Sequence, residues 1–195
     1  VQIDEAFEQW RHRSDLTTHL LTRITVPIET INPYDWMAVQ TAETQVLWHG
    51  RDDGICVAGI GKADVVAGGE GDDYDHILAR CRRFLGPLPG ARYFGGFAFQ
   101  PSSFDDDRWY GFGPSRFILP RFELVRHPAR TELRCNLLFR HDHPLDRVKI
   151  QDGLADMRFP DSDTDRRLPA IVGRKDYPDK MGWSGNVLSA LDLIK

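Results

Sequence analysis

The chain has 195 residues, 41% of them hydrophobic, which is enough for the core of one compact domain of ordinary size. Its 25 Lys+Arg against 29 Asp+Glu give a formal net charge of -4, which argues against a binder of nucleic acids or anionic membranes. No run reaches the roughly 18 apolar residues of a membrane span, and residues 1–10 are acidic and amphipathic, unlike a secretory signal. We therefore expect a cytoplasmic protein.

The first 66 residues predict two helices and three strands. Apolar residues at helical spacing predict a helix over residues 3–20, and alternation of apolar and polar residues predicts a strand over 23–28. A proline in the first turn, followed by apolar residues, predicts a short helix over 33–40. Strands over 44–49 and 55–66 flank a polar, glycine-bounded tip, so these two segments are expected to form a hairpin.

An acidic turn at residues 68–73 comes next and supplies the N-cap of a helix whose apolar side runs from Ile77 to Leu85. The elements expected after this helix are strands over 91–99, 116–126 and 131–141, a helix over 144–157, an exposed loop over 159–178 and an amphipathic helix over 179–195. The fold class predicted is α+β, with one mainly antiparallel sheet, helices packed on one face, and the other face free for a partner.

Three cysteines lie 25 and 54 residues apart in apolar or strand-like surroundings: Cys56, Cys81 and Cys135. This spacing matches neither a zinc site nor a disulfide framework. We expect all three to be buried as small hydrophobic side chains.

Motifs that could carry chemistry are incomplete. His141-Asp142-His143 has two metal-binding imidazoles but no third ligand at a recognisable spacing, and Asp105–Asp107 lacks the pattern of a calcium loop. The glycines of Gly59–Gly61 and Gly68–Gly71 do not form a phosphate-binding loop, and Gly182–Gly185 lacks the spacing of a nucleophile elbow. The sequence therefore assigns no catalytic, cofactor-binding or metal residue.

One block of the sequence is distinctive for its aromatic residues and paired glycines. It contains Tyr93-Phe94-Gly95-Gly96-Phe97-Ala98-Phe99 and, further on, Phe117-Ile118-Leu119-Pro120-Arg121. Paired glycines weaken a strand unless another backbone or an aromatic ring approaches closely. The block is expected to form part of a buried sheet core.

The same block resembles the N-terminal half of isochorismate synthases, which belong to the family of chorismate-utilising enzymes. Four further motifs follow the order of that half: Pro27-Ile28 before a helix with Pro33 and Trp36, Leu47-Trp48, the Gly-x-Gly-x-Ala strand Gly59, Gly61 and Ala63, and Tyr177-Pro178 before a helix with Trp183, Val187 and Ala190-Leu191. The resemblance covers nearly the whole chain.

The resemblance implies that residues 1–195 are the N-terminal half of an enzyme with a layered α/β structure, whose C-terminal catalytic half is absent. The reaction implied is the magnesium-dependent conversion of chorismate to isochorismate, for menaquinone or siderophore biosynthesis. In that family a lysine activates water, a glutamate protonates the departing hydroxyl and other glutamates hold magnesium, all within the C-terminal half. Lys195 precedes that half and is not the catalytic lysine, so this chain alone is expected to be inactive and to bind no magnesium.

Two alternatives remain open. Relatives with the same fold make anthranilate, aminodeoxychorismate or salicylate, so the substrate class is better determined than the product. A non-enzymatic module is the second alternative, since 20 of the 25 basic residues are arginines and a guanidinium group suits anionic carboxylates. For the isolated half, an apolar face without its partner predicts self-association.

Overall fold

The structure, a computed structural model, describes residues 4–6, 8, 20–51, 54–69, 71–86, 88–98, 111–140, 145, 147–161, 173 and 175–194. Where composition predicts one compact unit, the chain forms two, Val1–Pro160 and Asp161–Lys195. The first unit holds both sheets and most helices, and the second holds the C-terminal helix.

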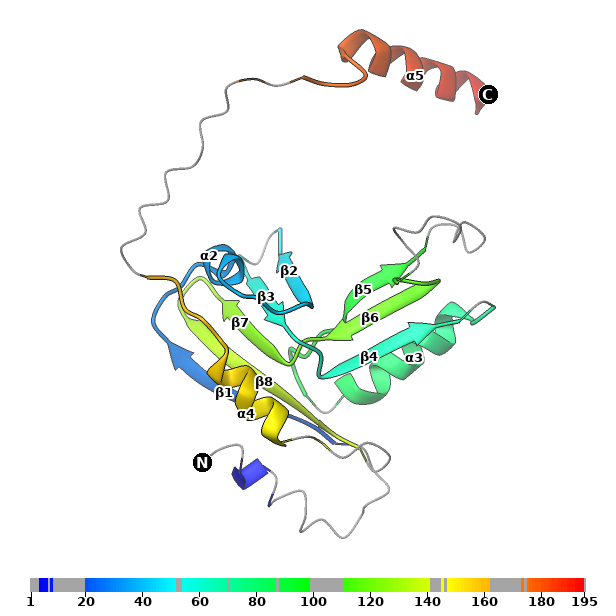
Figure 1. Cartoon of the computed structure of the whole chain (residues 1–195). Helices are drawn as coiled ribbons and strands as arrows, with labels where there is room; N and C mark the ends of the chain where they lie inside the picture. The colour runs from blue at the N-terminus through cyan, green and yellow to red at the C-terminus, as the bar shows by residue number, and fades with distance from the viewer. Residues whose placement is uncertain are drawn as a thin grey trace. The chain divides into compact units, whose positions relative to one another are not determined.

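Two antiparallel sheets form the first unit (Figure 1). The five-stranded sheet has the order β1-β8-β7-β3-β2 and consists of β1 (Leu20–Ile28), β2 (Gln45–His49), β3 (Cys56–Ile60), β7 (Phe122–Arg126) and β8 (Thr131–Phe139). The three-stranded sheet has the order β4-β6-β5 and consists of β4 (Asp64–Gly68), β5 (Phe94–Phe97) and β6 (Ser115–Leu119). The α+β class, the antiparallel pairing and the hairpin of β2 and β3 are confirmed.

The prediction of one continuous sheet is wrong, because two predicted strands each bend into two. The strand predicted over 55–66 divides into β3 and β4, and the one over 116–126 divides into β6 and β7. Proline has no backbone N–H and cannot continue a ladder through Pro120. The paired strands still bond across the bend, from Ala63 N to Leu119 O (2.8 Å) and from Arg121 N to Ile60 O (3.1 Å). Both strands therefore turn together from one sheet into the next.

The main core lies on one face of the five-stranded sheet, under α2 (Pro33–Ala38) and α4 (Arg147–Ala155). The Asn32 side chain caps α2 by accepting a hydrogen bond from the backbone N–H of Tyr34. Trp36 of α2 is fully buried against this face. The buried cluster comprises Trp36, Met37, Ala58, Ile60, Phe122, Leu124, Cys135, Leu137, Phe139 and Ile150.

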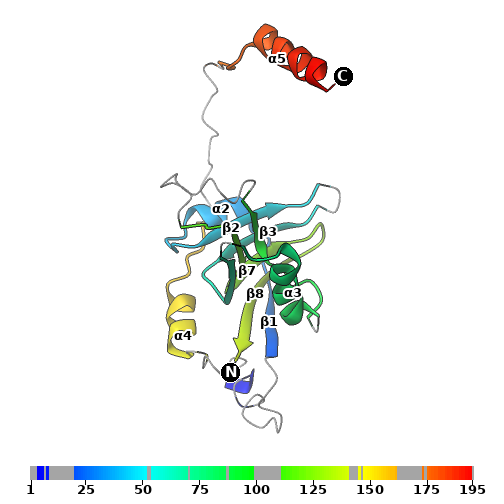
Figure 2. The ribbon, with the colours of Figure 1, turned by 90° about the vertical axis from the view of Figure 1, so that its right-hand side faces the viewer.

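The third helix of the first unit, α3 (Tyr74–Leu85), lies on the opposite side of the sheet, so the expectation of helices on one face is wrong. Its Phe84 packs with Leu21 and Leu138, whose side chains alternate with those of Leu20 and Phe139 in the main core. Figure 2 shows α3 and α4 on opposite sides of β8. The corner between the two sheets explains the position of α3, because α3 follows β4 in the chain and packs against the three-stranded sheet.

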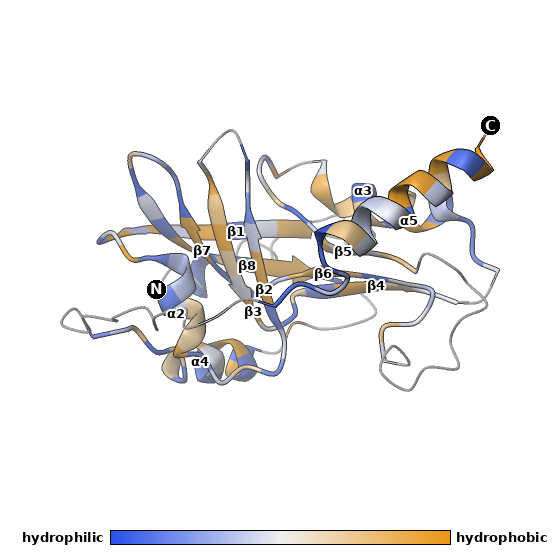
Figure 3. Ribbon diagram, turned by 90° about the horizontal axis from the view of Figure 1, so that it is seen from above, coloured by the Kyte–Doolittle hydropathy of each residue, from blue (hydrophilic) through white to orange (hydrophobic). Residues whose placement is uncertain are grey.

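Most of the remaining elements match their predicted positions with shifted ends, whereas the loop predicted over 159–178 lies mostly outside the described residues. The helix predicted over 3–20 is wrong at its C-terminal end, since Leu20 pairs with Phe139 as the first residue of β1; residues 4–6 and 8 are helical, and most of the rest lies outside the described residues. The second unit contains α5 (Lys180–Leu193), as predicted, with the Asp179 carboxylate accepting from the N–H of Gly182. Within this unit α5 buries no side chain, and its C-terminal turns are largely hydrophobic (Figure 3).

Among the described helices, none is both long and apolar enough to cross a membrane.

Candidate functional site

The corner between the two sheets brings together two of the motifs that the sequence singles out. Pro120 is fully buried against Gly59, where a Cβ atom would lie only 2.6 Å from Cγ of the proline ring. Arg121 donates from Nη1 to the carbonyl of Asn136 (2.6 Å) and from Nη2 to the carbonyl of Lys62 (3.4 Å). Gly59 and the Leu119–Arg121 segment therefore pack together and fix the geometry of the corner.

Of the paired glycines of β5, Gly95 has the close backbone approach that the sequence predicts, whereas a Cβ atom at Gly96 would have no atom within 4 Å. A Cβ atom at Gly95, where φ is +156°, would collide with the backbone carbonyl of Arg116 on β6. The aromatic ring of Phe97 lies 5.1 Å from that of Phe117 and 4.5 Å from that of Tyr74. These distances are typical of aromatic packing, but Phe97 and Phe117 are only half-buried and Gly95 is exposed. The prediction of a buried sheet core is therefore confirmed for Leu119 and Pro120 and is wrong for the described aromatic residues of the block.

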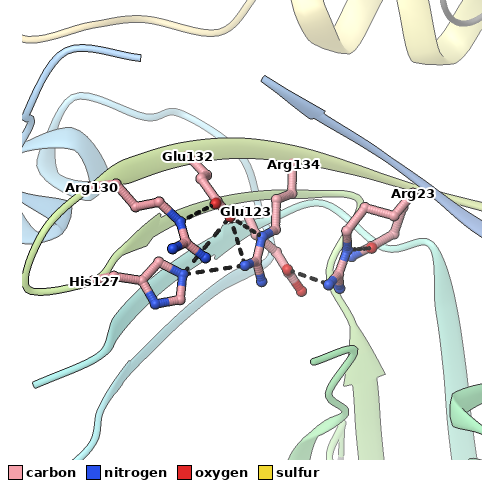
Figure 4. A network of polar contacts seen from close by, with 7 residues as sticks. Arg23, Glu123, His127, Arg130, Glu132 and Arg134 are labelled. Atoms are coloured by element: carbon pink, nitrogen blue, oxygen red, sulfur yellow. Dashed lines mark hydrogen bonds and ion pairs between the residues drawn. The ribbon is translucent and has the colours of Figure 1, made fainter. Parts of the chain in front are cut away.

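A network of charged side chains covers the face of the five-stranded sheet opposite the main core (Figure 4). We call it the arginine network, and it comprises Arg23, Glu123, His127, Arg130, Glu132, Arg134 and Asn136. Arg23 donates from Nε to Oδ1 of Asn136 (2.8 Å) and from Nη2 to Oε2 of Glu123 (3.3 Å). Strand alternation places these side chains on one face, since Arg23 pairs with Asn136 and Glu123 pairs with Arg134.

Glu132 organises the outer part of the network. Its carboxylate accepts from Nη2 of Arg134 (2.7 Å) and from Nε of Arg130 (2.5 Å), while Nη2 of Arg134 also lies 3.3 Å from Nε2 of His127. Figure 4 shows these four side chains gathered together, with Arg23 and Glu123 beside them. Hydrogen bonds between charged groups are stronger than neutral ones, so these contacts stabilise this part of the sheet.

Burial and charge shift the pKa values of the network in different directions. Burial raises the pKa of Glu123, although Arg23 opposes the shift, and burial lowers the pKa of Arg23. Burial also tends to raise the pKa of Glu132, but its hydrogen bonds from Arg134 and Arg130 outweigh that effect and lower it. Burial and the charge of Arg130 lower the pKa of His127, so the imidazole is mostly neutral at pH 7.

A second buried carboxylate lies at the start of β4. Asp64 accepts a hydrogen bond from the Tyr93 hydroxyl (2.6 Å) and pairs with Nη1 of Arg140 (3.3 Å). Burial and this hydrogen bond raise the pKa of Tyr93, so the phenol stays protonated and serves as a donor. These contacts join the start of β4, the residue that follows β8 and the segment before β5, so Asp64 and Tyr93 have a structural role.

Two cavities adjoin the five-stranded sheet. One of about 240 Å³ lies between α4 and the corner and is lined by Gln40, Thr41, Ala42, Ile60, Gly61, Phe122, Gly153, Asp156 and Met157. The other, of about 340 Å³, is lined by Asn32, Pro33, Tyr34, His49, Gly54, Cys56, Arg126 and Pro128. In the second, the Tyr34 hydroxyl lies 3.5 Å from Nδ1 of His49, a poor hydrogen bond, and burial raises the pKa of Cys56. Neither set of described lining residues forms an activated nucleophile.

A family comparison identifies the chain. The model of the family described as "Chorismate binding enzyme" matches residues 5–195. The chain belongs to the chorismate-binding enzyme family. The resemblance drawn from Gly59, Gly61, Phe94–Phe97 and Leu119–Arg121 is therefore confirmed at the level of the family.

A solved structure of the same fold extends beyond this chorismate-binding chain. The menaquinone-specific isochorismate synthase MenF of Escherichia coli is similar with a TM-score of 0.53 and 20% sequence identity, over 98% of this chain and 41% of that chain. At this identity the likeness shows the fold alone. The chain thus spans less than half the length of the isochorismate synthase that it matches. No curated protein sequence matches it significantly.

The residues considered at the sequence level do not assemble into a catalytic site in the described part of the chorismate-binding chain. His141, His143 and Asp105–Asp107 lie outside the described residues. Gly182–Gly185 lies within α5, where it forms no nucleophile elbow, since that motif needs a turn between a strand and a helix. Cys56, Cys81 and Cys135 are free and buried, as predicted.

The arginine network is the feature that sequence reasoning missed. Its members come from β1, β7, β8 and the turn between the last two, so Arg23 lies 113 residues from Asn136. The one available signal was a polar side chain in every second position of Thr131–Asn136, which places Glu132, Arg134 and Asn136 on the same strand face. Such alternation is typical of solvated sheet faces, so it does not by itself reveal a buried network.

Proposed function

We propose that residues 1–195 are the N-terminal, scaffolding part of an isochorismate synthase, a cytoplasmic enzyme that converts chorismate to isochorismate for menaquinone or siderophore biosynthesis. The observation that carries the proposal is the fold likeness to MenF, which extends over 98% of this chain and 41% of that one. Family membership over residues 5–195 supports chorismate as the substrate of the whole protein.

A scaffolding role is supported by what the family motifs do in this chain. Gly59 and Pro120 pack against each other, Arg121 bonds backbone carbonyls, and Gly95 permits close approach of two strands. Each of these residues stabilises the two sheets, and none is positioned as an acid, base or nucleophile. We infer that the chain by itself does not turn over chorismate.

Magnesium is part of the proposed reaction, but the described residues do not fit it. No group of three or more His, Cys, Asp or Glu side chains capable of holding a metal occurs among them. Magnesium prefers several oxygen ligands in octahedral geometry, which this part of the chain does not offer. We propose that residues outside this chain bind the ion.

The proposal is tested by comparing the 195-residue chain with the full protein encoded by the same reading frame. Both are incubated with chorismate and Mg²⁺, and the products are separated by chromatography. We expect isochorismate from the full protein and no product from the 195-residue chain. Anthranilate, aminodeoxychorismate or salicylate as the product would assign a different branch, and turnover by the 195-residue chain would contradict the scaffolding role.

A further inference from the structure

The arginine network and its surroundings carry more positive than negative charge. Four guanidinium groups, those of Arg23, Arg92, Arg130 and Arg134, interact electrostatically with two carboxylates, those of Glu123 and Glu132. His127 adds no full charge at pH 7, because burial lowers its pKa. The side chains of Arg23 and Arg134 are only 6% and 14% exposed. These two buried arginines are matched by the two carboxylates, so the excess positive charge comes from Arg92 and from Arg130, whose side chain is 64% exposed. This excess gives the face a positive field that attracts an anion.

The two arginines that are most buried within the network each have one nitrogen near the same point. A Cβ atom built on Gly90 would lie 3.9 Å from Nη1 of Arg23 and 4.0 Å from Nη1 of Arg134. The hydrogen bonds of Arg23 use Nε and Nη2, and those of Arg134 also use Nε and Nη2. Within the described residues, neither Nη1 atom donates to an acceptor. Gly90 itself is exposed, so the point is reached from solvent.

A carboxylate fits this arrangement. Its two oxygens can each accept one hydrogen bond, so a single carboxylate placed beside Gly90 can bridge both Nη1 groups. Arg92 adds positive field from a fixed position, since its guanidinium group stacks 4.8 Å from the ring centroid of Trp48. We propose that Arg23 and Arg134 form a binding site for a small carboxylate anion beside Gly90, on the sheet face that carries the arginine network.

The site is separate from the family motifs. Gly59, Gly95 and Pro120 make packing contacts with other protein atoms, whereas Nη1 of Arg23 and Arg134 are donors without an acceptor in the described chain. The proposal therefore does not depend on which reaction the whole protein catalyses, and a negative result would leave the proposed isochorismate synthase function untouched.

A substitution at Gly90 tests the site without removing either arginine. Gly90→Asp would place its Cβ atom on this point and a carboxylate one bond beyond it, and Gly90→Asn would place a neutral side chain of nearly the same shape there. Both residues tolerate the positive φ of +73° at this position better than other side chains do. Arg134→Gln removes one donor directly, and Arg126→Gln, at an exposed arginine of the same hairpin, is its matched control.

The measurement is binding of sodium malonate to the 195-residue chain by calorimetry, and its effect on the melting temperature, at constant ionic strength set with sodium chloride. We expect saturable binding and a rise of roughly 5 °C or more at about 100 times the dissociation constant. Binding should persist in Gly90→Asn and Arg126→Gln and be lost in Gly90→Asp and Arg134→Gln. Without malonate, Gly90→Asp should melt at a higher temperature than Gly90→Asn. Absence of saturable binding, or equal binding to the Asp and Asn variants, would overturn the proposal.

Discussion

The corner between the sheets makes a quantitative prediction for Gly59→Ala. The added Cβ atom would lie 2.6 Å from Cγ and 2.8 Å from Cβ of Pro120, whereas ordinary contacts begin at 3.4 Å, so the two groups must separate by about 0.8 Å. Gly59 lies on β3, which is bonded on both sides by β2 and β7, and Pro120 is fully buried. Neither group can move without displacing the sheet.

Overpacking of this kind destabilises a folded protein by about 1–3 kcal/mol. For a unit of this size the melting temperature should fall by roughly 3–10 °C. The assay is thermal and urea unfolding of the 195-residue chain, followed by circular dichroism. Gly96→Ala is the matched control, because Gly96 also lies in a strand but has no atom within 4 Å of an added Cβ. Its stability should change by about 0.5 kcal/mol or less.

A double variant tests the cause of the destabilisation. Pro120→Ala removes the nearer atom, Cγ at 2.6 Å, but keeps Cβ at 2.8 Å, so Gly59→Ala should be less harmful in the Pro120→Ala background than in the parent chain. The two substitutions would then be non-additive by about 0.5 kcal/mol or more. The reasoning would be refuted by a Gly59→Ala chain as stable as Gly96→Ala, or by strictly additive effects in the double variant.

Three further predictions concern charge, thiols and association. Glu132→Gln should destabilise the chain by about 2 kcal/mol at pH 7, through weakened bonds to Arg134 and Arg130. Since the folded-state pKa of Glu132 lies below 4.5, the stabilisation that its carboxylate provides is present above that pH and is lost as the pH falls through the folded-state pKa. Urea unfolding should therefore show the stabilities of the parent and Glu132→Gln chains converging in acid, and a constant difference would contradict this. Glu43→Gln, at an exposed glutamate, is the control. A thiol reagent at pH 8 should label Cys56, Cys81 and Cys135 only in denaturant, because all three are buried and burial raises the pKa of each thiol, that of Cys135 to about 11. Rapid labelling of the folded chain would disprove their burial. Finally, the double variant Trp183→Ser/Leu191→Ser should abolish the expected self-association in sedimentation experiments, since both apolar side chains are more than half exposed on α5. A parent chain that stays monomeric at high concentration would rule this association out.

Local patterns were sufficient for most elements of the fold. The polar tip between β2 and β3, the N-caps at Asn32, Asp73 and Asp179, and the alternation along β1 and β8 depend on residues close in sequence. Such signals act through backbone geometry and short-range hydrogen bonds, so they can be recognised without the tertiary structure. The order of the family motifs also identified the chorismate-binding family, as the match over residues 5–195 confirms.

Tertiary structure decided how the sheets and charges are arranged. Leu119-Pro120-Arg121 indicates a strand next to a proline, but only the pairing of Pro120 with Gly59, 61 residues away, turns two strands into a corner and one sheet into two. The same long-range pairing carries α3 to the face opposite α4. Arg23 and Arg134 become neighbours only because β1 and β8 pair in one register, and their burial depends on packing across the sheet. Contacts between residues so far apart in the sequence leave no local periodicity by which they could be recognised. The overall charge of the chain, which argues against nucleic-acid binding, likewise does not show how arginines gather on one face of a sheet.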